Sequence, residues 1–438
     1  MWAKDAAHIR IMTENDAMLN LWSATAPPSI QAPPLEGDAT ADVAVIGGGF
    51  TGLSAALHLA LEGADIRLIE ARSFGHGGSG RNVGLVNAGL WTPPAEIETM
   101  LGAEAGTRLN DALAVGPDLV FSLIERFHIA CEATRNGTLH LAHSARGFGD
   151  LRNRHRQQIQ RGAPVTLLGR AQTAERTGSE AFHGALHDAR AGTIQPLAYV
   201  HGLARAAADS GARLHTHTPA LGWSRDAGGW RIETPAGSLR AKRLIHATNA
   251  YDTVLPQARA FTPVFYLQFA TSPVPEAQRG RLLPRGEGCW DTATVMSSFR
   301  FDRTGRLVIG GVGNPAGWRS STHRHWARRK VRSIYPALAD LDLEFGWRGR
   351  IAMTDDHLPR IVALGEDGIS IFGYSGRGIG PGTVFGKCAA RWAKTGAPES
   401  FPLPLSRTRS DIMAPVKAAC YDLGSLAAHL VGARLGGS

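Results

Sequence analysis

Apolar and polar residues first form a regular pattern about a tenth of the way along the chain. Asp42–Ile46 is a short apolar run that predicts a buried parallel strand, and the glycine-rich stretch Gly47–Gly52 interrupts it. Small and apolar residues then recur at helical spacing over Leu53–Leu61, and Gly63 ends the predicted helix. Because Ile66–Ile69 predicts a second strand, we expect a strand–helix–strand unit here.

Helical and strand-like patterns alternate along the rest of the chain, after a proline-rich lead-in at 24–37 that predicts little regular structure. The predicted helices cover residues 107–129, 196–210 and 322–336, and a further helix begins at Val384. The predicted strands lie near 138–143, in a segment ending at Leu221, in a hairpin over 222–232, at 244–247, in short runs within 262–312, and at 369–374. No fixed period repeats, so we expect two domains built from several separated segments, not a solenoid or propeller.

Length and composition agree with two globular domains. The chain has 438 residues, 43% of them hydrophobic and 19% charged, which is typical of a soluble globular protein. No apolar run approaches the roughly 18 residues of a membrane span, and the first residues include acids where a signal peptide would be apolar. The four cysteines lie far apart, so they predict reduced thiols and neither a disulfide framework nor a zinc site. We therefore expect a cytoplasmic protein.

The formal net charge of +9 does not alter the expectation of a soluble globular protein. Arg supplies 41 of the 47 basic residues, which together with abundant Ala and Gly indicates a compositional bias. The densest basic run, Arg319–Arg332, predicts a helix with Ala327, Val331 and Ile334 on one side and most arginines on the other. A solvated helix face is the preferred interpretation, and a patch that binds an anion or a phosphate backbone is the alternative.

The strongest local signal for chemistry is Gly47-x-Gly49-x-x-Gly52. Glycines at this spacing between a strand and a helix allow a tight turn, close approach of the backbone to a pyrophosphate, and close helix–strand packing. The helix N-terminus then presents free N–H groups to the phosphates. Glu70, at the end of the second strand, can accept hydrogen bonds from both hydroxyls of a ribose. The combination predicts a dinucleotide site, with a purely structural glycine turn as the alternative.

Two further glycine-rich loops bear on the kind of dinucleotide. Gly75–Gly89 contains Arg81 and Asn82 and has the composition to wrap the diphosphate and ribityl chain of a longer cofactor. Gly373–Gly382 directly precedes a predicted helix, whose N-terminus can stabilise negative charge on a reduced flavin. No second GxGxxG follows a strand, which argues against a separate nicotinamide domain.

Motifs along nearly the whole chain resemble the D-amino-acid-oxidase family of flavoenzymes, and its gamma-glutamylputrescine oxidoreductase branch in particular. They are Asp42–Gly89, Gly192–Pro196 with Thr218–Ala220, Ala247–Tyr251, Trp347–Thr354 with Asp356 and Pro359, and Gly373–Gly378, in that order. The resemblance implies an α/β (α+β) fold, in which a Rossmann-like FAD-binding domain joins a substrate domain built on a mostly antiparallel β-sheet. It also implies transfer of a hydride equivalent from the carbon next to nitrogen to the flavin, followed by hydrolysis of the imine.

The domains that the resemblance implies are discontinuous. The FAD-binding domain would comprise residues 38–92, 180–255 and 345–400, and the substrate domain residues 93–179 and 256–344, with a lead-in at 1–37 and a C-terminal extension at 401–438.

The resemblance also assigns cofactor-binding candidates. The ADP half would be held by Gly47, Gly49, Gly52 and Glu70, with the backbone of Ala220 on the adenine side, and further cofactor-binding candidates nearby are Phe50, Thr51, Ala71 and Arg72. Those for the diphosphate and the flavin ring are Ser79, Gly80, Arg81, Asn82, Gly84, Leu85, Thr248, Asn249, Gly376, Arg377, Gly378 and Ile379. The opposite wall would come from the substrate sheet, over Pro263–Thr271 and Val295–Phe301.

Departures from the family pattern bear on how FAD is bound, on the substrate and on the electron acceptor. Some members bind FAD covalently through a Cys near the Trp347–Thr354 segment or a His near the position of Asn82, and this chain has neither, which implies noncovalent FAD. Gly380 stands where amino-acid oxidases carry a Lys for the substrate carboxylate, so an amine is favoured over an α-amino acid. No Lys occurs between Lys242 and Lys330 to match the one that activates dioxygen in sarcosine oxidase, so the electron acceptor is either O2 or another molecule.

Four residues are candidates for substrate contact and catalysis: Arg377, Tyr266, Arg300 and Asn87. Arg377 either stabilises an anionic flavin or binds an anionic substrate tail, or it pairs with a surface acid. Arg300 either faces the substrate or forms a structural ion pair. Tyr266, like its neighbour Gln268, lines the pocket or packs in the core. His76 is expected at the surface, and the histidine spacing predicts no metal site.

The leading hypothesis is therefore an FAD-dependent oxidase or dehydrogenase of a small primary or secondary amine. Candidate substrates are gamma-glutamylated polyamines, N-methylated amines, aminophosphonates and aminosulfonates. The alternatives are a tRNA-modifying flavoenzyme, an oxidase of sarcosine- or glycine-like amino acids, and a partner-dependent flavin subunit. Nucleic acid is not an expected partner, because the chain has no basic patch interleaved with aromatic residues.

Overall fold

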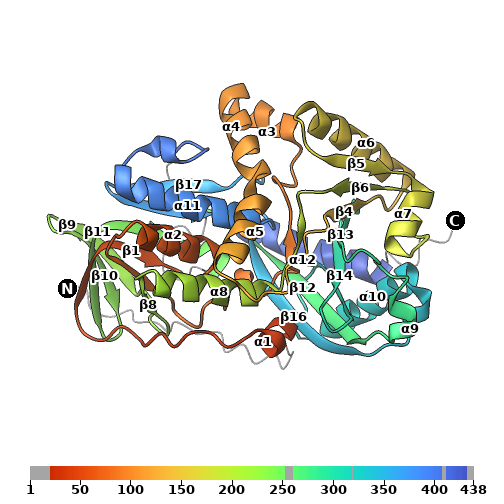
Figure 1. The fold of residues 1–438 in the computed structure, drawn as a ribbon, viewed down its shortest axis with the longest axis horizontal. Helices are drawn as coiled ribbons and strands as arrows, with labels where there is room; N and C mark the ends of the chain where they lie inside the picture. Colours follow the sequence, from red (N-terminus) through yellow and green to blue (C-terminus); the bar gives the residue numbers. More distant parts are fainter. Residues whose placement is uncertain (1–19, 252–259, 318, 407–410, 432–438) are drawn as a thin grey trace.

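Two large sheets organise the chain (Figure 1). The computed structural model describes residues 20–251, 260–317, 319–406 and 411–431. The first sheet has the strand order β17-β18-β11-β1-β2-β8, and β10 and β9 extend it beside β11. The second sheet has the order β16-β12-β15-β14-β13-β4-β6-β5, and β3 and β7 form a separate pair.

The strands of the first sheet are β1 (Ala39–Ile46), β2 (Ile66–Ile69), β8 (Arg213–His215), β9 (Gly222–Asp226), β10 (Gly229–Thr234), β11 (Gly237–His246), β17 (Arg360–Gly365) and β18 (Gly368–Phe372). Those of the second sheet are β4 (Thr138–Leu141), β5 (Val165–Leu168), β6 (Ala185–Asp188), β12 (Thr262–Pro273), β13 (Gly288–Asp291), β14 (Ser297–Phe301), β15 (Arg306–Val312) and β16 (Leu343–Met353). The short pair is β3 (Leu85–Val86) and β7 (Gly192–Thr193).

The helices are α1 (Leu21–Thr25), α2 (Phe50–Leu61), α3 (Pro94–Leu101), α4 (Ala103–Ala114), α5 (Gly116–Arg126), α6 (Ala145–Gln160), α7 (Arg170–Thr177), α8 (Pro196–Asp209), α9 (Glu276–Arg279), α10 (Arg319–Ile334), α11 (Ile379–Thr395) and α12 (Ala414–Val431).

The first sheet is parallel at its centre. The strands β8, β2, β1, β11 and β18 pair in parallel, whereas β17, β10 and β9 pair antiparallel. Its central strands are buried on both sides, and they are accordingly runs of Val, Ile, Leu and Ala. The predicted strand–helix–strand unit is present as β1, α2 and β2. Helices α8 and α11 pack beside α2 (Figure 1).

The second sheet is mostly antiparallel, with β13 and β4 as a parallel pair among its described strands. One of its faces is apolar and packs against α10. On that helix Ala327, Val331 and Ile334 are buried as predicted, and Trp326 and His323 are buried with them. The predicted α/β fold with a mostly antiparallel second sheet is confirmed.

Several predicted elements have different bounds in the structure. The single helix expected over 107–129 is two helices, α4 and α5, which meet at Gly116 and Pro117. The helix expected from Val384 begins at Ile379, and the strand expected to end at Leu221 ends at His215. The lead-in contains the short helix α1, and the C-terminal extension contains α12; neither helix was predicted.

For two strands, the sheet to which the strand belongs differs from the domain that the sequence predicts for its segment. Strand β6 lies within the segment expected to bind FAD but pairs with β4 and β5 of the second sheet. Strand β16 begins at Leu343, and most of it falls in the segment assigned to the FAD domain, yet it pairs with β12. Strand β16 is followed directly by β17 of the first sheet, whereas β7 and α8 lie between β6 and β8, the next strand of the first sheet.

None of the helices in the described ranges is long and apolar enough to cross a membrane.

Candidate functional site

The predicted cofactor-binding residues gather at one edge of the first sheet. Because β1, β2, β11 and β18 are parallel, their carboxyl ends all lie at this edge. The segments that follow these strands are Gly47–Gly52, Glu70–Arg72, Thr248–Asn249 and Gly373–Gly378. Four sequence segments that are far apart along the chain therefore meet where ligands bind in open α/β sheets.

The turn from β1 into α2 has no room for side chains. Gly47 has a φ of 109°, and a Cβ added there would lie 2.7 Å from the carbonyl oxygen of Ala247. Gly49 caps α2 without a side-chain hydrogen bond, and the N–H of Phe50 donates to Ser79 Oγ at 3.2 Å. The turn thus exposes backbone and the positive end of a helix dipole to a ligand.

Glu70 holds this turn from the end of β2. Its carboxylate accepts hydrogen bonds from the N–H of Gly48 at 2.7 Å and from the N–H of Arg72 at 2.9 Å. Burial raises the pKa of Glu70, and these backbone donors act in the opposite direction. Ala71 and Arg72 are exposed, and Ala220 is partly buried two residues after Thr218, whose N–H donates to the carbonyl of Glu70.

The loop from Gly75 to Gly89 is held by its own polar side chains. The Asn82 amide donates to the carbonyls of Gly78 and Ser79, and its oxygen accepts from the N–H of Gly84. Arg81 donates from Nε to the carbonyl of His76 and from Nη1 to the carbonyl of Arg348. Arg81 and Asn82, expected along the diphosphate and ring, thus shape the loop. Gly80 is buried within it, and Leu85 begins β3 directly after Gly84.

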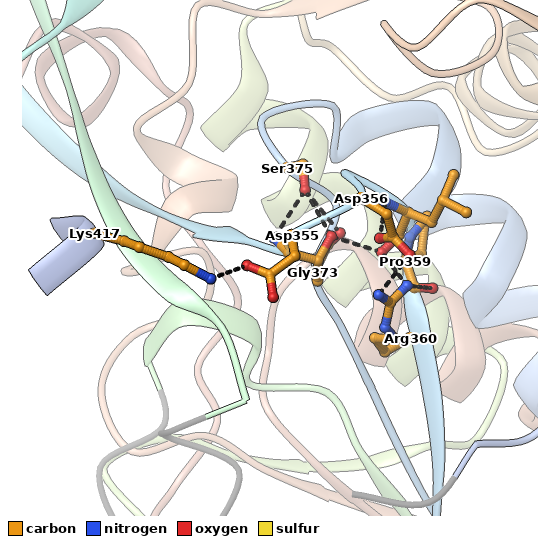
Figure 2. Close-up of polar contacts among 9 residues, drawn as sticks. Asp355, Asp356, Pro359, Arg360, Gly373, Ser375 and Lys417 are labelled. Atoms are coloured by element: carbon orange, nitrogen blue, oxygen red, sulfur yellow. Dashed lines mark hydrogen bonds and ion pairs between the residues drawn. The ribbon is translucent and has the colours of Figure 1, made fainter. Parts of the chain in front are cut away.

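The second glycine loop, Gly373–Gly378, is tied to the chain around it (Figure 2). Ser375 Oγ donates to the carbonyl of Gly373 at 3.3 Å and lies 3.2 Å from Thr354 Oγ1. The N–H of Gly373 donates to the side-chain oxygen of Asn249 at 2.9 Å. Nearby, Thr248 Oγ1 lies 2.6 Å from Nε2 of the buried His246. Asn249 thus contacts this loop and Thr248 is its neighbour in the chain, and both stay candidates for contact with the diphosphate.

The segment that leads into β17 carries a second group of contacts in Figure 2. Asp356 accepts from the N–H of Leu358 at 3.0 Å and from Arg360 Nη2 at 2.7 Å. Asp355 points the other way and pairs with Lys417 of α12 at 2.5 Å. The loop is therefore fixed both to the first sheet and to the C-terminal helix.

The N-termini of α2 and α11 lie side by side. Tyr374 Oη is 2.7 Å from Thr51 Oγ1, and a Cβ added at Gly382 would lie 3.2 Å from Thr51 Oγ1. Gly378 caps α11, again without a side-chain hydrogen bond, and Ile379 is buried at its first position. Two helix N-termini with glycine as the N-cap residue lie at one place, and together they favour negative charge on a bound ligand.

The second sheet presents a continuous row of residues on its non-core face. Register pairing links His140, Trp290, Ser298, Gly310, Gln268 and Trp347 across six neighbouring strands, so their side chains share one face. We call these six residues the cross-strand row. The adjacent row on the opposite face, Leu139, Cys289, Phe299, Ile309 and Phe269, belongs to the core under α10.

The cross-strand row meets the cofactor-binding edge at both of its ends. The indole of Trp347 donates to the carbonyl of Arg81 at 3.0 Å. At the other end the guanidinium of Arg377 lies 4.5 Å from the ring centroid of Trp290, and Trp290 stacks on His140 at 3.3 Å. Arg377 also donates to the carbonyl of Ala88 at 3.1 Å. The row therefore faces the two glycine loops.

Three of the predicted catalytic candidates lie along this face. Tyr266 Oη is 2.8 Å from Ser298 Oγ of the row, and burial raises the pKa of Tyr266, so it is a neutral phenol. Asn87 accepts a hydrogen bond from Thr138 of β4 at 2.7 Å, which joins the glycine loop to the sheet. Arg377 stays charged at neutral pH, although burial and then the Arg154 cation lower its pKa.

Arg300 lies on the same face but makes contacts of a different kind. It is 2% exposed, donates to the carbonyls of Val83 and Ile194, each at 2.7 Å, and lies over the ring of Trp22. These contacts join the second sheet to the glycine loop and to the lead-in, which favours a structural role that acts through backbone carbonyls and an indole in place of the expected ion pair.

Gln268 is fully buried in the middle of the cross-strand row. Neither its amide nitrogen nor its amide oxygen has a hydrogen-bond partner among the described residues. Gly310 makes room for it, because a Cβ there would lie 2.6 Å from the Gln268 amide carbon. A buried amide without protein partners is costly unless a ligand or water satisfies it.

Sequence reasoning missed two residues of this face, Trp290 and His140. Trp290 follows the core residue Cys289 in β13. Because side chains alternate along a strand, Trp290 points to the face of the sheet away from that core. That alternation could have indicated a half-buried aromatic residue on the non-core face. The contact with Arg377 carries no sequence signal, because it depends on how the two sheets meet.

Comparisons with known proteins agree with this geometry. A family model described as DAO, FAD dependent oxidoreductase, matches residues 42–392. A probable oxidoreductase OrdL from Rhizobium meliloti (strain 1021) is 35% identical over 379 residues, which cover 85% of this chain and 87% of the relative. The gamma-glutamylputrescine oxidoreductase of Escherichia coli (strain K12) is 28% identical over 407 residues, covering 88% of this chain and 92% of that protein.

A solved structure shows the same fold. The glycine oxidase of Geobacillus kaustophilus aligns with 86% of this chain and 98% of its own, with a TM-score of 0.66 and 21% identity. The resemblance seen in the motifs is thus confirmed, and the chain belongs to the DAO family of FAD-dependent oxidoreductases.

Proposed function

We propose that the protein binds FAD noncovalently and oxidises the C–N bond of a small amine, whose imine product hydrolyses to an aldehyde and an amine or ammonia. The observation that carries the proposal is the cross-strand row facing the two glycine loops. Its groups are aromatic rings, a hydroxyl and an amide, which can orient a small substrate. A gamma-glutamylputrescine oxidoreductase and glycine oxidases are among the relatives.

The residues at the sheet edge fit FAD. The side-chain-free turn at Gly47, the carboxylate of Glu70 and the two helix N-termini with glycine N-caps suit a ribose and a diphosphate. The unpaired amide of Gln268 offers a donor and an acceptor to a polar ring edge. Glu70 and the first turn of α2 would hold the ADP half, and Gly376–Ile379 with the N-terminus of α11 would hold the ring.

Three of the four thiols are held in a form that supports noncovalent binding. Cys289 lies in the apolar core on the far face of the second sheet, and burial raises its pKa well above the usual value. Burial likewise raises the pKa of Cys131 to about 12 and that of Cys388 to about 11. Thiols held in their protonated form are poor nucleophiles.

Bound FAD supplies a hydride acceptor for the carbon next to nitrogen. The chain positions the amine and controls its proton. The Arg377 cation beside Trp290 disfavours a second positive charge, so it lowers the pKa of a neighbouring amine toward the neutral form that can be oxidised. The paired hydroxyls of Tyr266 and Ser298 can accept a hydrogen bond from the amine N–H. Desolvation keeps His140 neutral, so it adds no charge there.

Product analysis tests the proposal. The purified holoprotein is incubated in air with gamma-glutamylputrescine, sarcosine, glycine, 2-aminoethylphosphonate or taurine, and aldehyde or keto-acid products are trapped with a hydrazine. We expect one amine to give a carbonyl product, with hydrogen peroxide if O2 is the acceptor. Absence of product in air and with an artificial electron acceptor, for every amine, would contradict the proposal.

A further inference from the structure

The outward surface of α12 and of the residues just before it is apolar. Of the twelve large hydrophobic side chains that are exposed within the described ranges, seven lie between Ile412 and Val431. Leu423 is 60% exposed, and Leu430 near the end of the helix is 49% exposed. A single exposed hydrophobic side chain is ordinary, whereas a contiguous apolar patch indicates an interaction surface.

The exposed apolar residues share one face of α12. They follow one another at alternating spacings of four and three residues, so they form a single line along the helix. We call these residues the apolar stripe, and its members are Val416, Cys420, Leu423, Ala427 and Leu430. The stripe runs from the first turn of α12 to its last turn.

The Lys, Asp and His side chains of α12 contact the rest of the protein and do not lie on the stripe. Lys417 pairs with Asp355 at 2.5 Å, and Asp422 lies 3.5 Å from a guanidinium nitrogen of Arg319 in α10. His429 is 1% exposed. A surface helix ordinarily turns its charged residues outward, so the outward face of α12 is poorly suited to water.

The helix beside the stripe is rich in cations. Helix α12 packs against α10 and β12, and Arg329 of α10 donates to the carbonyl of His429 near the end of α12. Arg332 is exposed and lies one turn after Arg329, so it faces solvent on the side of α10 that adjoins α12. Within the described part of the chain Arg332 has no ion-pair partner. Arg324 and Arg328 are also exposed, and the sequence of α10 contains no acid.

A second copy of the chain fits this surface less well than an anionic partner does. A stable dimer buries roughly 800 Å² on each copy. At about 1.5 Å per residue the 18 residues of α12 extend only about 27 Å, so the stripe alone supplies a smaller area. A two-fold contact would also face the surface with itself, which leaves the cations of α10 without an anionic counterpart.

We propose that α12 and the adjoining face of α10 bind the surface of an anionic lipid membrane. The apolar stripe lies at the boundary between headgroups and acyl chains, and the guanidinium groups of α10 contact lipid phosphates. Helices that lie in a membrane interface combine an apolar face with flanking cations in this way. The inference goes beyond the proposed amine oxidation and does not depend on it.

Sedimentation of the purified holoprotein with vesicles tests the inference. The vesicles are phosphatidylcholine alone, or equal parts of phosphatidylcholine and phosphatidylglycerol. We expect the protein to bind the mixed vesicles at least tenfold more tightly than phosphatidylcholine alone, and added salt to weaken this binding because it screens the charges.

Matched variants separate the two contributions. Leu423→Gln should weaken binding to the mixed vesicles about tenfold, whereas Leu221→Gln, at an exposed position outside α12, should not. Arg332→Gln should weaken binding about fivefold, whereas Arg156→Gln, at an exposed position of α6, should not. All four positions are at the surface, so the variants should fold like the wild type.

A fluorophore on the stripe shows which surface contacts the lipid. Cys420 is exposed, Cys131 and Cys289 are buried, and Cys388→Ser removes the partly buried thiol. A thiol-reactive, environment-sensitive fluorophore therefore labels Cys420 in that variant. We expect its emission to shift to shorter wavelength with the mixed vesicles and to be quenched by brominated lipids.

Several results would overturn the inference. They are no binding to the mixed vesicles, equal binding to both kinds of vesicle, equal effects of Leu423→Gln and Leu221→Gln, and binding that leaves the Cys420 fluorophore unchanged. A protein that ignores vesicles but sediments as a dimer, which Leu423→Gln dissociates, would show that the stripe pairs with a second copy instead.

Discussion

Gln268 shows how a single side chain can distinguish a core position from a ligand site. Its amide is fully buried, and neither polar atom has a partner in the described structure. A packing role would use only the aliphatic part of the side chain, whereas a cofactor role needs the amide itself.

We therefore expect Gln268→Met to weaken FAD binding about tenfold and to shift the visible spectrum of the bound flavin. The apoprotein should be as stable as the wild type or slightly more so, because an unsatisfied buried amide is removed. Equilibrium dialysis of FAD and urea unfolding of the apoprotein measure the two effects. Gln278→Met, at an exposed position of α9, is the control. Unchanged FAD affinity and spectrum would show that Gln268 has only a packing role.

At the scale of single residues, the sequence identified residues whose role depends on neighbouring positions in the chain. Gly47 and Gly52 follow from the chemistry of one turn, and Glu70 follows from its place at the end of the next strand. Trp290 was not predicted because its contacts, Arg377 and His140, come from other elements. For Arg377 and Arg300 the sequence left two interpretations open, since the same residue type serves a ligand or a carbonyl equally well.

Among the elements, the pair formed by α2 and α11 carries most of the site. The two helices approach closely through Gly386, where an added Cβ would lie 2.5 Å from Ser54 Cβ and 2.5 Å from the carbonyl oxygen of Thr51. Ser54 Oγ also donates to the carbonyl of Thr383 at 2.8 Å. The distance between the two helices, and with it the relative position of their N-termini, depends on the absence of a side chain here.

Gly386→Ala should therefore destabilise the protein by about 1–3 kcal/mol and reduce FAD retention, although Ala has the better helix propensity. Gly424→Ala in α12 is the matched control, because a Cβ there has open space. It should be neutral or stabilising by roughly 0.5–1 kcal/mol. Thermal unfolding of apo and holo forms gives the comparison. Equal effects of the two substitutions would contradict close packing of α2 on α11.

A comparison of predicted and observed elements also shows where the local sequence pattern fails to predict a boundary. The β1–α2–β2 unit was predicted well because its apolar runs and glycine turn agree with each other. The start of α11 was predicted too late because Gly380, Pro381 and Gly382 are poor helix formers in isolation. In the fold, Gly382 is required for contact with Thr51, so tertiary packing outweighs propensity.

At the scale of the whole molecule, α12 packs against β12 of the second sheet and against α10. His429 of α12 is 1% exposed, lies 2.7 Å from His323 of α10 between the two Nδ1 atoms, and stacks on Trp326. Desolvation, with nearby cations as a smaller cause, lowers the pKa of His429 to about 3. In the unfolded chain a histidine titrates near 6.5.

Because the folded pKa of His429 lies below the unfolded value, its contribution to stability is fully present above pH 6.5 and is lost as the pH falls toward 3. Lowering the pH from 7 to 5 should cost about 2 kcal/mol for this group alone. His429→Asn should reduce that loss by the same amount, while His325→Asn, on the exposed face of α10, should not. Urea unfolding at both pH values measures this. An unchanged pH dependence in His429→Asn would contradict the assignment.

The two-sheet architecture was predictable from the family resemblance, but the way the sheets meet was not. Strand β16 is followed directly by β17 of the first sheet, β7 and α8 separate β6 from β8, and composition gives no signal at these junctions. The face between the sheets, where the cross-strand row lies opposite the glycine loops, is therefore a property of the folded molecule alone.

Anaerobic reduction of the bound flavin tests the central claim most directly. The purified holoenzyme is mixed without oxygen with gamma-glutamylputrescine, sarcosine, glycine, 2-aminoethylphosphonate or taurine, and the visible absorption of the oxidised flavin is followed. We predict that at least one of these amines abolishes this band, because its hydride reduces the bound flavin. A flavin that no amine reduces would contradict amine oxidation as the function of this protein.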